Sequence, residues 1–105
     1  MAAVSLADFD IKYQYEGDVT VAFLISPATM DSGDTVDITA LLKGRTLVGL
    51  DGWDIDTTNG VNQLTPTTDL SYAVATDVIT VDATGGTTDS TYVLRVELMN
   101  TNSSK

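Results

Sequence analysis

The side chains with the most potential for chemistry are the carboxylates of one acidic segment, Asp51-Gly52-Trp53-Asp54-Ile55-Asp56. On a β-strand Asp54 and Asp56 project from the same face, and Asp51 would reach that face from a preceding turn. Calcium accepts such oxygen-only ligation, so Asp51, Asp54 and Asp56 are the candidates for a calcium site. The spacing does not match the calcium loop between two helices. We therefore favour a solvated strand face beside a turn, and we expect no metal and no cofactor.

Catalysis would have to use carboxylates alone, because the chain of 105 residues contains no histidine and no cysteine. Two carboxyl groups at a suitable separation suffice for glycoside hydrolysis. Nothing in the sequence selects one pair among the fifteen acidic residues. The many threonine hydroxyls have no base beside them that would make one a nucleophile. We expect no catalytic residues and no enzymatic activity.

Aromatic side chains offer a different function, since a flat platform of rings can stack on a sugar. Trp53 could form such a platform with Tyr13, Tyr15, Tyr72 or Tyr92. These tyrosines occupy alternating positions that should face inward, so packing in the core is the favoured interpretation. A carbohydrate-binding or receptor-binding β module remains the alternative function.

The net charge of −10, from fifteen acids against five bases, limits the partners of the chain. Binding to nucleic acid needs clustered Lys and Arg, and an anionic membrane surface repels an acidic protein. We expect neither partner. The first ten residues lack the basic start of a signal peptide, and the longest apolar run, at residues 21–25, is too short to span a bilayer. The protein is therefore expected to be made in soluble form in the cytoplasm.

Strand-like alternation begins at residues 9–16, where Phe9, Ile11, Tyr13 and Tyr15 alternate with polar residues. The turn residues Glu16-Gly17-Asp18 connect this strand to a second one at residues 19–26, which predicts a β-hairpin ended by Pro27. Residues 35–39 are predicted as a strand. The competing prediction is a helix that starts at Asp34 and stops at Gly44.

The middle of the chain predicts short strands separated by turns. Lys43-Gly44-Arg45 is a turn, residues 46–50 form a strand, and Asp51-Gly52 is a further turn. The Asn59-Gly60 pair favours a hairpin that joins residues 53–56 to residues 61–64. Leu70, Tyr72 and Val74 alternate, and a strand follows at residues 78–81.

The last apolar run, Ser90 to Met99, is the best strand in the sequence. Its alternation places Tyr92, Leu94, Val96 and Leu98 on a wholly apolar side, which we expect in the core. The other side carries Val93, Arg95, Glu97 and Met99, and it is too apolar for a plainly solvated face. An arm of the chain or a partner is expected to cover that side.

Turns every eight to twelve residues predict an all-β fold, a single-domain antiparallel β-sandwich or barrel-like domain of about eight short strands. Residues 9–99 form this domain. Residues 1–8 are expected to be an N-terminal arm or edge strand, and residues 100–105 a polar C-terminal tail.

In style, length and strand order the chain resembles the small all-β capsid decoration, or cement, proteins and related virion structural proteins of tailed bacteriophages. The segments that carry the resemblance are Met30-Asp31-Ser32-Gly33-Asp34-Thr35-Val36-Asp37-Ile38, Leu47-Val48-Gly49-Leu50-Asp51, Val78-Ile79-Thr80-Val81 and Thr91-Tyr92-Val93-Leu94-Arg95-Val96. Tail-tube and fibre-base β domains have a similar composition.

The resemblance implies a non-enzymatic protein on the capsid surface of a virion. Such proteins bind across junctions between copies of the major capsid protein, or to another virion protein, and often assemble as dimers or trimers. We accordingly expect a homo-oligomer. The residues expected to contact a partner are Lys43, Arg45, Val93, Arg95 and Met99.

Overall fold

The computed structural model describes residues 2–56, 60–64, 69–81 and 90–100. Within them the chain forms nine strands and two short 3₁₀ helices. The strands are β1 (Ala3–Val4), β2 (Asp10–Glu16), β3 (Val19–Ile25), β4 (Thr35–Asp37), β5 (Arg45–Asp56), β6 (Gly60–Gln63), β7 (Leu70–Ala73), β8 (Val78–Val81) and β9 (Thr91–Asn100). The 3₁₀ helices are η1 (Leu6–Asp8) and η2 (Thr39–Leu41).

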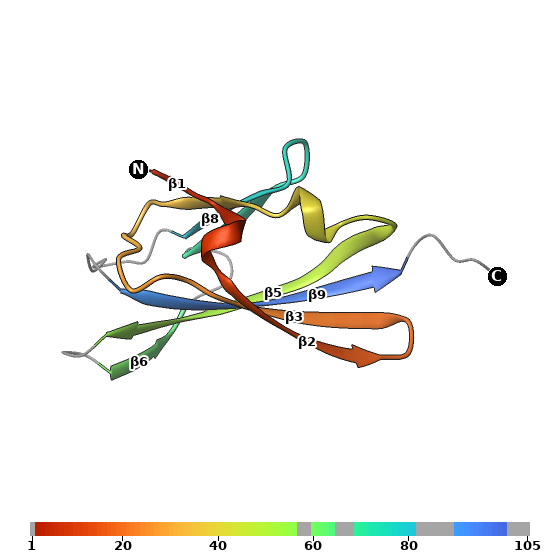
Figure 1. Cartoon of the computed structure of the whole chain (residues 1–105), viewed down its shortest axis with the longest axis horizontal. Coiled ribbons are helices and arrows are strands. Elements are labelled where there is room, and N and C mark those ends of the chain that lie inside the picture. Colours follow the sequence, from red (N-terminus) through yellow and green to blue (C-terminus); the bar gives the residue numbers. More distant parts are fainter. Residues whose placement is uncertain (1, 57–59, 65–68, 82–89, 101–105) are drawn as a thin grey trace.

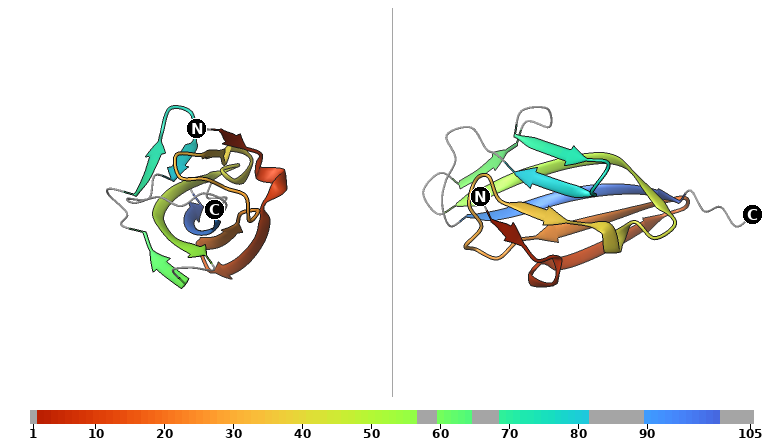
Figure 2. Two further views of the ribbon diagram at one scale, coloured as in Figure 1. Left: turned by 90° about the vertical axis from the view of Figure 1, so that its left-hand side faces the viewer. Right: turned by 90° about the horizontal axis from the view of Figure 1, so that it is seen from above.

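Two sheets pack face to face, which confirms the predicted all-β sandwich. The smaller sheet has the strand order β1-β4-β8-β7, and the larger one has the order β2-β3-β9-β5-β6. All pairs are antiparallel except β1 with β4. In Figure 1 the smaller sheet lies above the larger one, and the end-on view of Figure 2 shows the two layers curving around a common interior.

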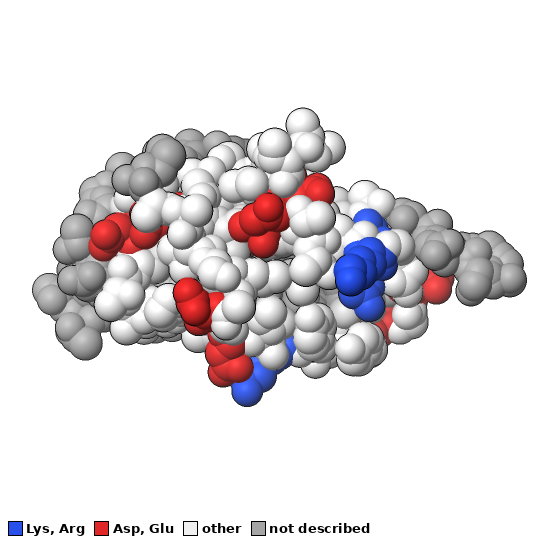
Figure 3. All heavy atoms as spheres, turned by 45° about the horizontal axis from the view of Figure 1, so that its top comes forward, with Lys and Arg blue, Asp and Glu red and all other residues white. Residues whose placement is uncertain are grey.

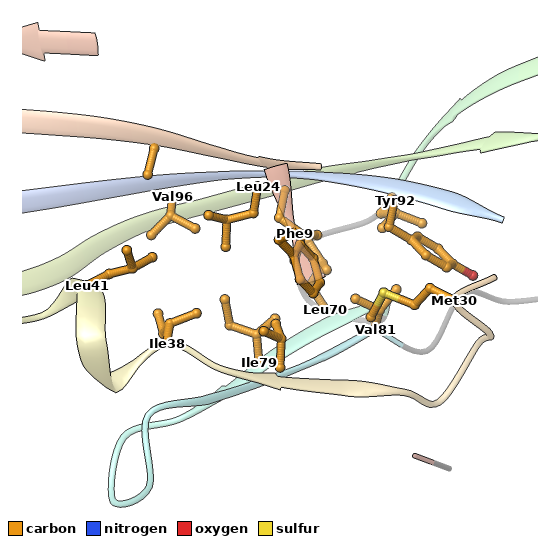
Figure 4. Packing of buried hydrophobic residues seen from close by; sticks show 14 of the residues in the cluster. Phe9, Leu24, Met30, Ile38, Leu41, Leu70, Ile79, Val81, Tyr92 and Val96 are labelled. Carbon is orange, nitrogen blue, oxygen red and sulfur yellow. The ribbon is translucent and has the colours of Figure 1, made fainter. Parts of the chain in front are cut away.

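Strand β9 lies at the centre of the larger sheet, between β3 and β5. Its alternation is reproduced in full: Tyr92, Leu94, Val96 and Leu98 have no exposed surface. These four side chains point toward the smaller sheet, as Figure 4 shows for Tyr92 and Val96. The prediction for this face of the strand is confirmed.

The smaller sheet and its connections supply the other half of the core. Figure 4 shows Met30, Ile38, Leu41, Leu70, Ile79 and Val81 of this layer across from β9 and β3. The fully buried or nearly fully buried residues of this layer are Met30, Val36, Ile38, Leu41, Leu70, Ile79 and Val81. Each apolar group buried in this way stabilises the fold by about 25 cal/mol per Å² removed from water.

The hairpin β2–β3 is confirmed, with Asp10 opposite Ile25 at one end and Glu16 opposite Val19 at the turn. Gly17 adopts a φ of 65°, which glycine tolerates best, and this explains its place in so tight a turn. The register with β9 fixes which side chains of β3 face the core. Ala22 and Leu24 belong to the core, whereas Phe23 and Ile25 lie on the outer face of the sheet.

Strand β5 corrects the prediction of two short strands separated by an Asp51-Gly52 turn. It runs unbroken over twelve residues, with one irregularity in its pairing between Leu47 and Gly49. Gly52 is needed for packing instead of turning: a Cβ atom there would lie 3.0 Å from Leu64 and 3.1 Å from Leu94. The predicted pairing of residues 53–56 with the strand after them is confirmed, with Trp53 opposite Gln63. Residues 57–59 of that turn lie outside the described part.

Residues 35–39 divide between the two predictions made for them. Thr35–Asp37 form β4, and the chain then coils once as η2 before β5 begins. The buried carboxylate of Asp34 accepts hydrogen bonds from the backbone N–H groups of Ala2 (2.9 Å) and Asp31 (2.9 Å). The hydrogen bond from Ala2 holds the N-terminal segment beside β4. There β1 pairs with β4 as an edge strand.

Neighbouring residues of β9 provide a test of the two-sided strand. Leu94→Asp should abolish folding, because it places an unpaired charge in the core, and Leu94→Ala should cost about 2–5 kcal/mol. Val93→Asp, one position along and on the opposite face, should still fold. Urea unfolding followed by tryptophan fluorescence measures all three. Cooperative unfolding of the Leu94→Asp variant would show that the assignment of faces is wrong.

Candidate protein-binding surface

The outer face of the larger sheet is the surface that faces away from the core. The strand register aligns its side chains in rows across neighbouring strands. We define the outer face by the following residues: Asp10, Lys12, Gln14 and Glu16 from β2; Val19, Val21, Phe23 and Ile25 from β3; Thr91, Val93, Arg95, Glu97 and Met99 from β9; Thr46, Gly49, Asp51, Trp53 and Ile55 from β5; and Val61 and Gln63 from β6.

The centre of this outer face is apolar. One row places Ile25 beside Val93 and Val93 beside Trp53, and all three are partly exposed. The adjoining row adds Ile55 and Val61, which expose 38% and 67% of their surface. An outward face with this many aliphatic and aromatic side chains is unusual for a sheet that meets only water.

Arg95 lies within the outer face, and its guanidinium is already paired with two carboxylates of the same chain. Its guanidinium Nη1 is 3.5 Å from a carboxylate oxygen of Asp51 and 3.1 Å from one of Glu97. All three side chains are about one-third exposed, so each ion pair contributes only about 0–1 kcal/mol to stability. The pairs matter more for the surface, because Arg95 with its two carboxylates forms a polar patch of net negative charge beside the apolar row.

The five residues predicted to contact a partner do not form one cluster. Val93, Arg95 and Met99 share the outer face. Lys43 lies in the turn before β5, and the Arg45 guanidinium donates a hydrogen bond to the Leu41 carbonyl oxygen (3.3 Å), on the side of the smaller sheet. The structure therefore brings together three of the five and places the other two elsewhere.

The candidate calcium ligands are also separated. Asp51 pairs with Arg95 on the outer face, whereas Asp54 lies opposite Tyr92 on the inner face and is 5% exposed. The cause is the unbroken strand β5, in which positions 51 and 54 must point to opposite sides. The side chain of Asp56 is outside the described set. Among the described residues no group of three or more acidic side chains could hold a metal ion.

The tyrosines correct a further prediction. Tyr92 is buried, but Tyr13 and Tyr15 expose 45% and 69% of their surface, with ring centroids 6.1 Å apart and planes within 17° of parallel. They lie on the inner side of β2, where the β2–β3 hairpin extends beyond β4 and β8 (Figure 1). Trp53 lies on the outer face, so it does not share a platform with them.

A shallow groove of about 640 Å³ runs between the N-terminal segment, β4 and η2. Its one ionisable side chain is Asp37, which accepts hydrogen bonds from the Thr39 hydroxyl (2.6 Å) and backbone N–H (2.9 Å). These bonds lower the pKa of Asp37 below its usual value. The Thr39 hydroxyl also lies 3.5 Å from a carboxylate oxygen of Asp77. A carboxylate with a lowered pKa is a poor general base, so this pair of acids gives little support to acid–base catalysis there.

On the face of the molecule shown in Figure 3, charge is not gathered into one patch. On this face the acidic side chains occupy several separate places, with few basic ones among them (Figure 3).

In the part of the chain that the structure describes, no helix is long and apolar enough to cross a membrane.

The outer face includes residues that sequence reasoning did not single out, chiefly Phe23, Ile25 and Ile55. A signal for Phe23 and Ile25 was present, since their strand is apolar at the consecutive positions 21–25 and not only at alternate ones. Such a strand cannot hide both faces in one core.

Comparison of the chain with protein-family models, with curated proteins and with solved structures found no match. The basis for a functional proposal is therefore the geometry of the outer face, the composition of the chain and the resemblance noted in its sequence.

Tyr72 gives a prediction about pH. Its pKa is raised from 10.0 to about 12 by burial first, and then by the hydrogen bond from its hydroxyl to Asp77 (2.7 Å) and by the charge of that carboxylate. The protonated phenol therefore stabilises the fold fully below pH 10, and this stability is lost as the pH rises through about 12. Tyr72→Phe should lower stability near neutral pH by about 1 kcal/mol and remove this part of the alkaline loss.

Thermal melts of both proteins between neutral and strongly alkaline pH measure the effect. Tyr15→Phe, which removes an exposed phenol, serves as the control and should follow the parent protein. Parallel loss of stability in Tyr72→Phe and in the parent would contradict the assignment.

Proposed function

We propose that this protein is a non-enzymatic virion structural protein that decorates or cements a bacteriophage capsid, and that it binds across capsid subunits through the outer face of its larger sheet. The observation that carries the proposal is the apolar row at the centre of that face, formed by Ile25, Val93 and Trp53. A surface of this kind gains free energy when a partner excludes water from it.

The size of the outer face suits protein binding. Five strands about 4.8 Å apart, with about seven residues each at a rise of about 3.3 Å, present on the order of 500 Å². A standard protein–protein interface buries about 800 Å² on each partner. The face could thus supply the larger part of one side of such an interface, with its edges and turns supplying the remainder.

The charges of the outer face indicate the chemistry of the partner. Two carboxylates pair with Arg95 and outweigh its positive charge, and the net charge of the whole chain is −10. A matching capsid surface would present apolar side chains at its centre and basic groups around them. The same acidity on the exposed remainder of the molecule would discourage contact between neighbouring particles.

An enzymatic function has less support. The sequence has no histidine or cysteine, and the acidic segment around Trp53 divides its carboxylates between the two faces of β5. Binding is the function for which the described side chains offer a continuous surface.

The stacked pair Tyr13 and Tyr15 favours one second candidate, a carbohydrate-binding or receptor-binding module. Aromatic rings exposed side by side can receive a sugar ring. Binding on a glycan array that disappears in Tyr15→Ala, while the fold survives, would favour this candidate over capsid binding.

The test of the leading proposal uses emptied capsids of the encoding phage and the purified protein. Ile55→Asp should weaken capsid binding at least about tenfold, because it places a charge beside the apolar row. Val74→Asp is the matched control, since Val74 is 78% exposed and lies in the turn between β7 and β8 of the other sheet. Both variants should keep the melting temperature of the parent within a few degrees.

Particles that lack the protein should lose resistance to heat and to osmotic shock, and added parent protein should restore it. Two results together would contradict the proposal: the parent protein does not bind emptied capsids, and particles without it keep their full resistance to heat and osmotic shock. If Ile55→Asp binds capsids as tightly as the parent protein does, the protein still binds capsids, but the outer face is not the surface that it uses.

A further inference from the structure

Strand β2 forms one edge of the larger sheet and is regular along its whole length. It pairs with β3 at seven consecutive positions, from Asp10 opposite Ile25 to Glu16 opposite Val19. In the part of the chain that the structure describes, its other side pairs with no strand. Alternate backbone N–H and C=O groups along such an edge are available to another strand.

The outward side chains of β2 have a self-complementary order. Lys12, Gln14 and Glu16 lie on the same face and carry a positive, a neutral and a negative group in turn. An antiparallel copy of the strand, related by a two-fold axis through Gln14, places Lys12 opposite Glu16 of the second copy and Glu16 opposite its Lys12. The two glutamines then face each other at the axis.

Other two-fold registers are poorer. An axis through Tyr13 would oppose Asp10 and Glu16, and an axis through Lys12 would oppose two lysines. Axes through Ile11 or Tyr15 leave only three positions of each strand paired within the bounds of β2. The axis through Gln14 gives five paired positions and is the longest register in which no like charges face each other within the strand. Opposite charges across strands stabilise pairing, and like charges oppose it.

The same register accounts for the exposed tyrosines. It places Tyr13 opposite Tyr15 of the second copy, on the inner side of β2, and so joins two stacked pairs into one row of rings. Within one copy the two centroids are already 6.1 Å apart, while 45% and 69% of these residues' surface meets water. Aromatic pairs across strands contribute to sheet stability beyond the area that they bury.

We propose that a second copy of this chain adds to β2 in antiparallel orientation, with a two-fold axis through Gln14, and joins the two larger sheets into one. Lys12 exchanges its exposed contact with Asp10 (3.5 Å) for Glu16 of the second copy. The outer face stays open in this dimer, so the inference does not rest on the proposed function. We assign a second copy of the chain to this edge because the order of charges along Lys12, Gln14 and Glu16 is complementary to itself in antiparallel orientation.

Cysteine cross-linking tests the register directly, because the chain contains no cysteine of its own. In the proposed dimer the two copies of position 14 are directly opposite, with Cα atoms about 4.5–5.5 Å apart, which a disulfide can span. Gln14→Cys should form a covalent dimer under mild oxidation. Lys12→Cys is the matched control: its two copies would lie about 13 Å apart along the strand and should remain uncrosslinked.

Charge reversal tests the ion pairs independently. Lys12→Glu and Glu16→Lys should each weaken the dimer about tenfold in sedimentation equilibrium, and the double variant should recover the parent's affinity. Lys43→Glu makes the same change of charge at an exposed position outside β2 and should have no effect. A parent protein that stays monomeric at every concentration overturns the proposal. So does a double variant no tighter than the single ones, or equal cross-linking through positions 12 and 14.

Discussion

The fold depends on a single strand that must bury one face completely while it is bonded on both edges. Strand β9 pairs with β3 along one side and with β5 along the other, and every inward side chain from Tyr92 to Leu98 is sealed from water. A strand in that position fixes the register of its neighbours, since a slip by one residue would turn its apolar side chains outward. The smaller sheet serves largely to close the opposite side of this core.

The central strands of the larger sheet are apolar on both faces, and this property connects the fold to the proposed function. Leu24 and Leu94 belong to the core, while Ile25 and Val93, one position along, lie on the outer face. Because a sandwich of two layers covers only one face of each sheet, the second apolar face is left at the surface. Arg95, Asp51 and Glu97 place polar groups on that face, and the apolar row beside them stays uncovered.

Much of the fold could be predicted from the sequence. The alternation at residues 90–99 identified the inward face of β9, and the Gly17 turn identified the first hairpin, because both depend on short-range rules. Strand β5 was missed for a long-range reason. Asp51-Gly52 has the composition of a turn, but the glycine is there to let Leu64 and Leu94 approach the strand, and only the packed structure brings those residues together.

The composition of the outer face could be predicted only in part, for similar reasons. The mixed side of β9 singled out Val93 and Met99, and the register places both on the outer face. Periodicity could not reveal that Tyr13 and Tyr15 extend beyond the smaller sheet, since exposure there depends on where the opposing layer ends. Nor could it pair Arg95 with Asp51, which is distant in sequence and adjacent only through the register of β5 and β9.

The most direct measurement of the central claim, that the outer face is the contact surface, is oxidative footprinting of side chains in the free protein and on the capsid. Trp53 and Met99 report on the outer face, and Tyr72 reports on the smaller sheet. Capsid binding should slow oxidation of Trp53 and Met99 several-fold and leave Tyr72 unchanged. Oxidation of Trp53 and Met99 at the same rate in both states, with protection of Tyr72 instead, would contradict the account.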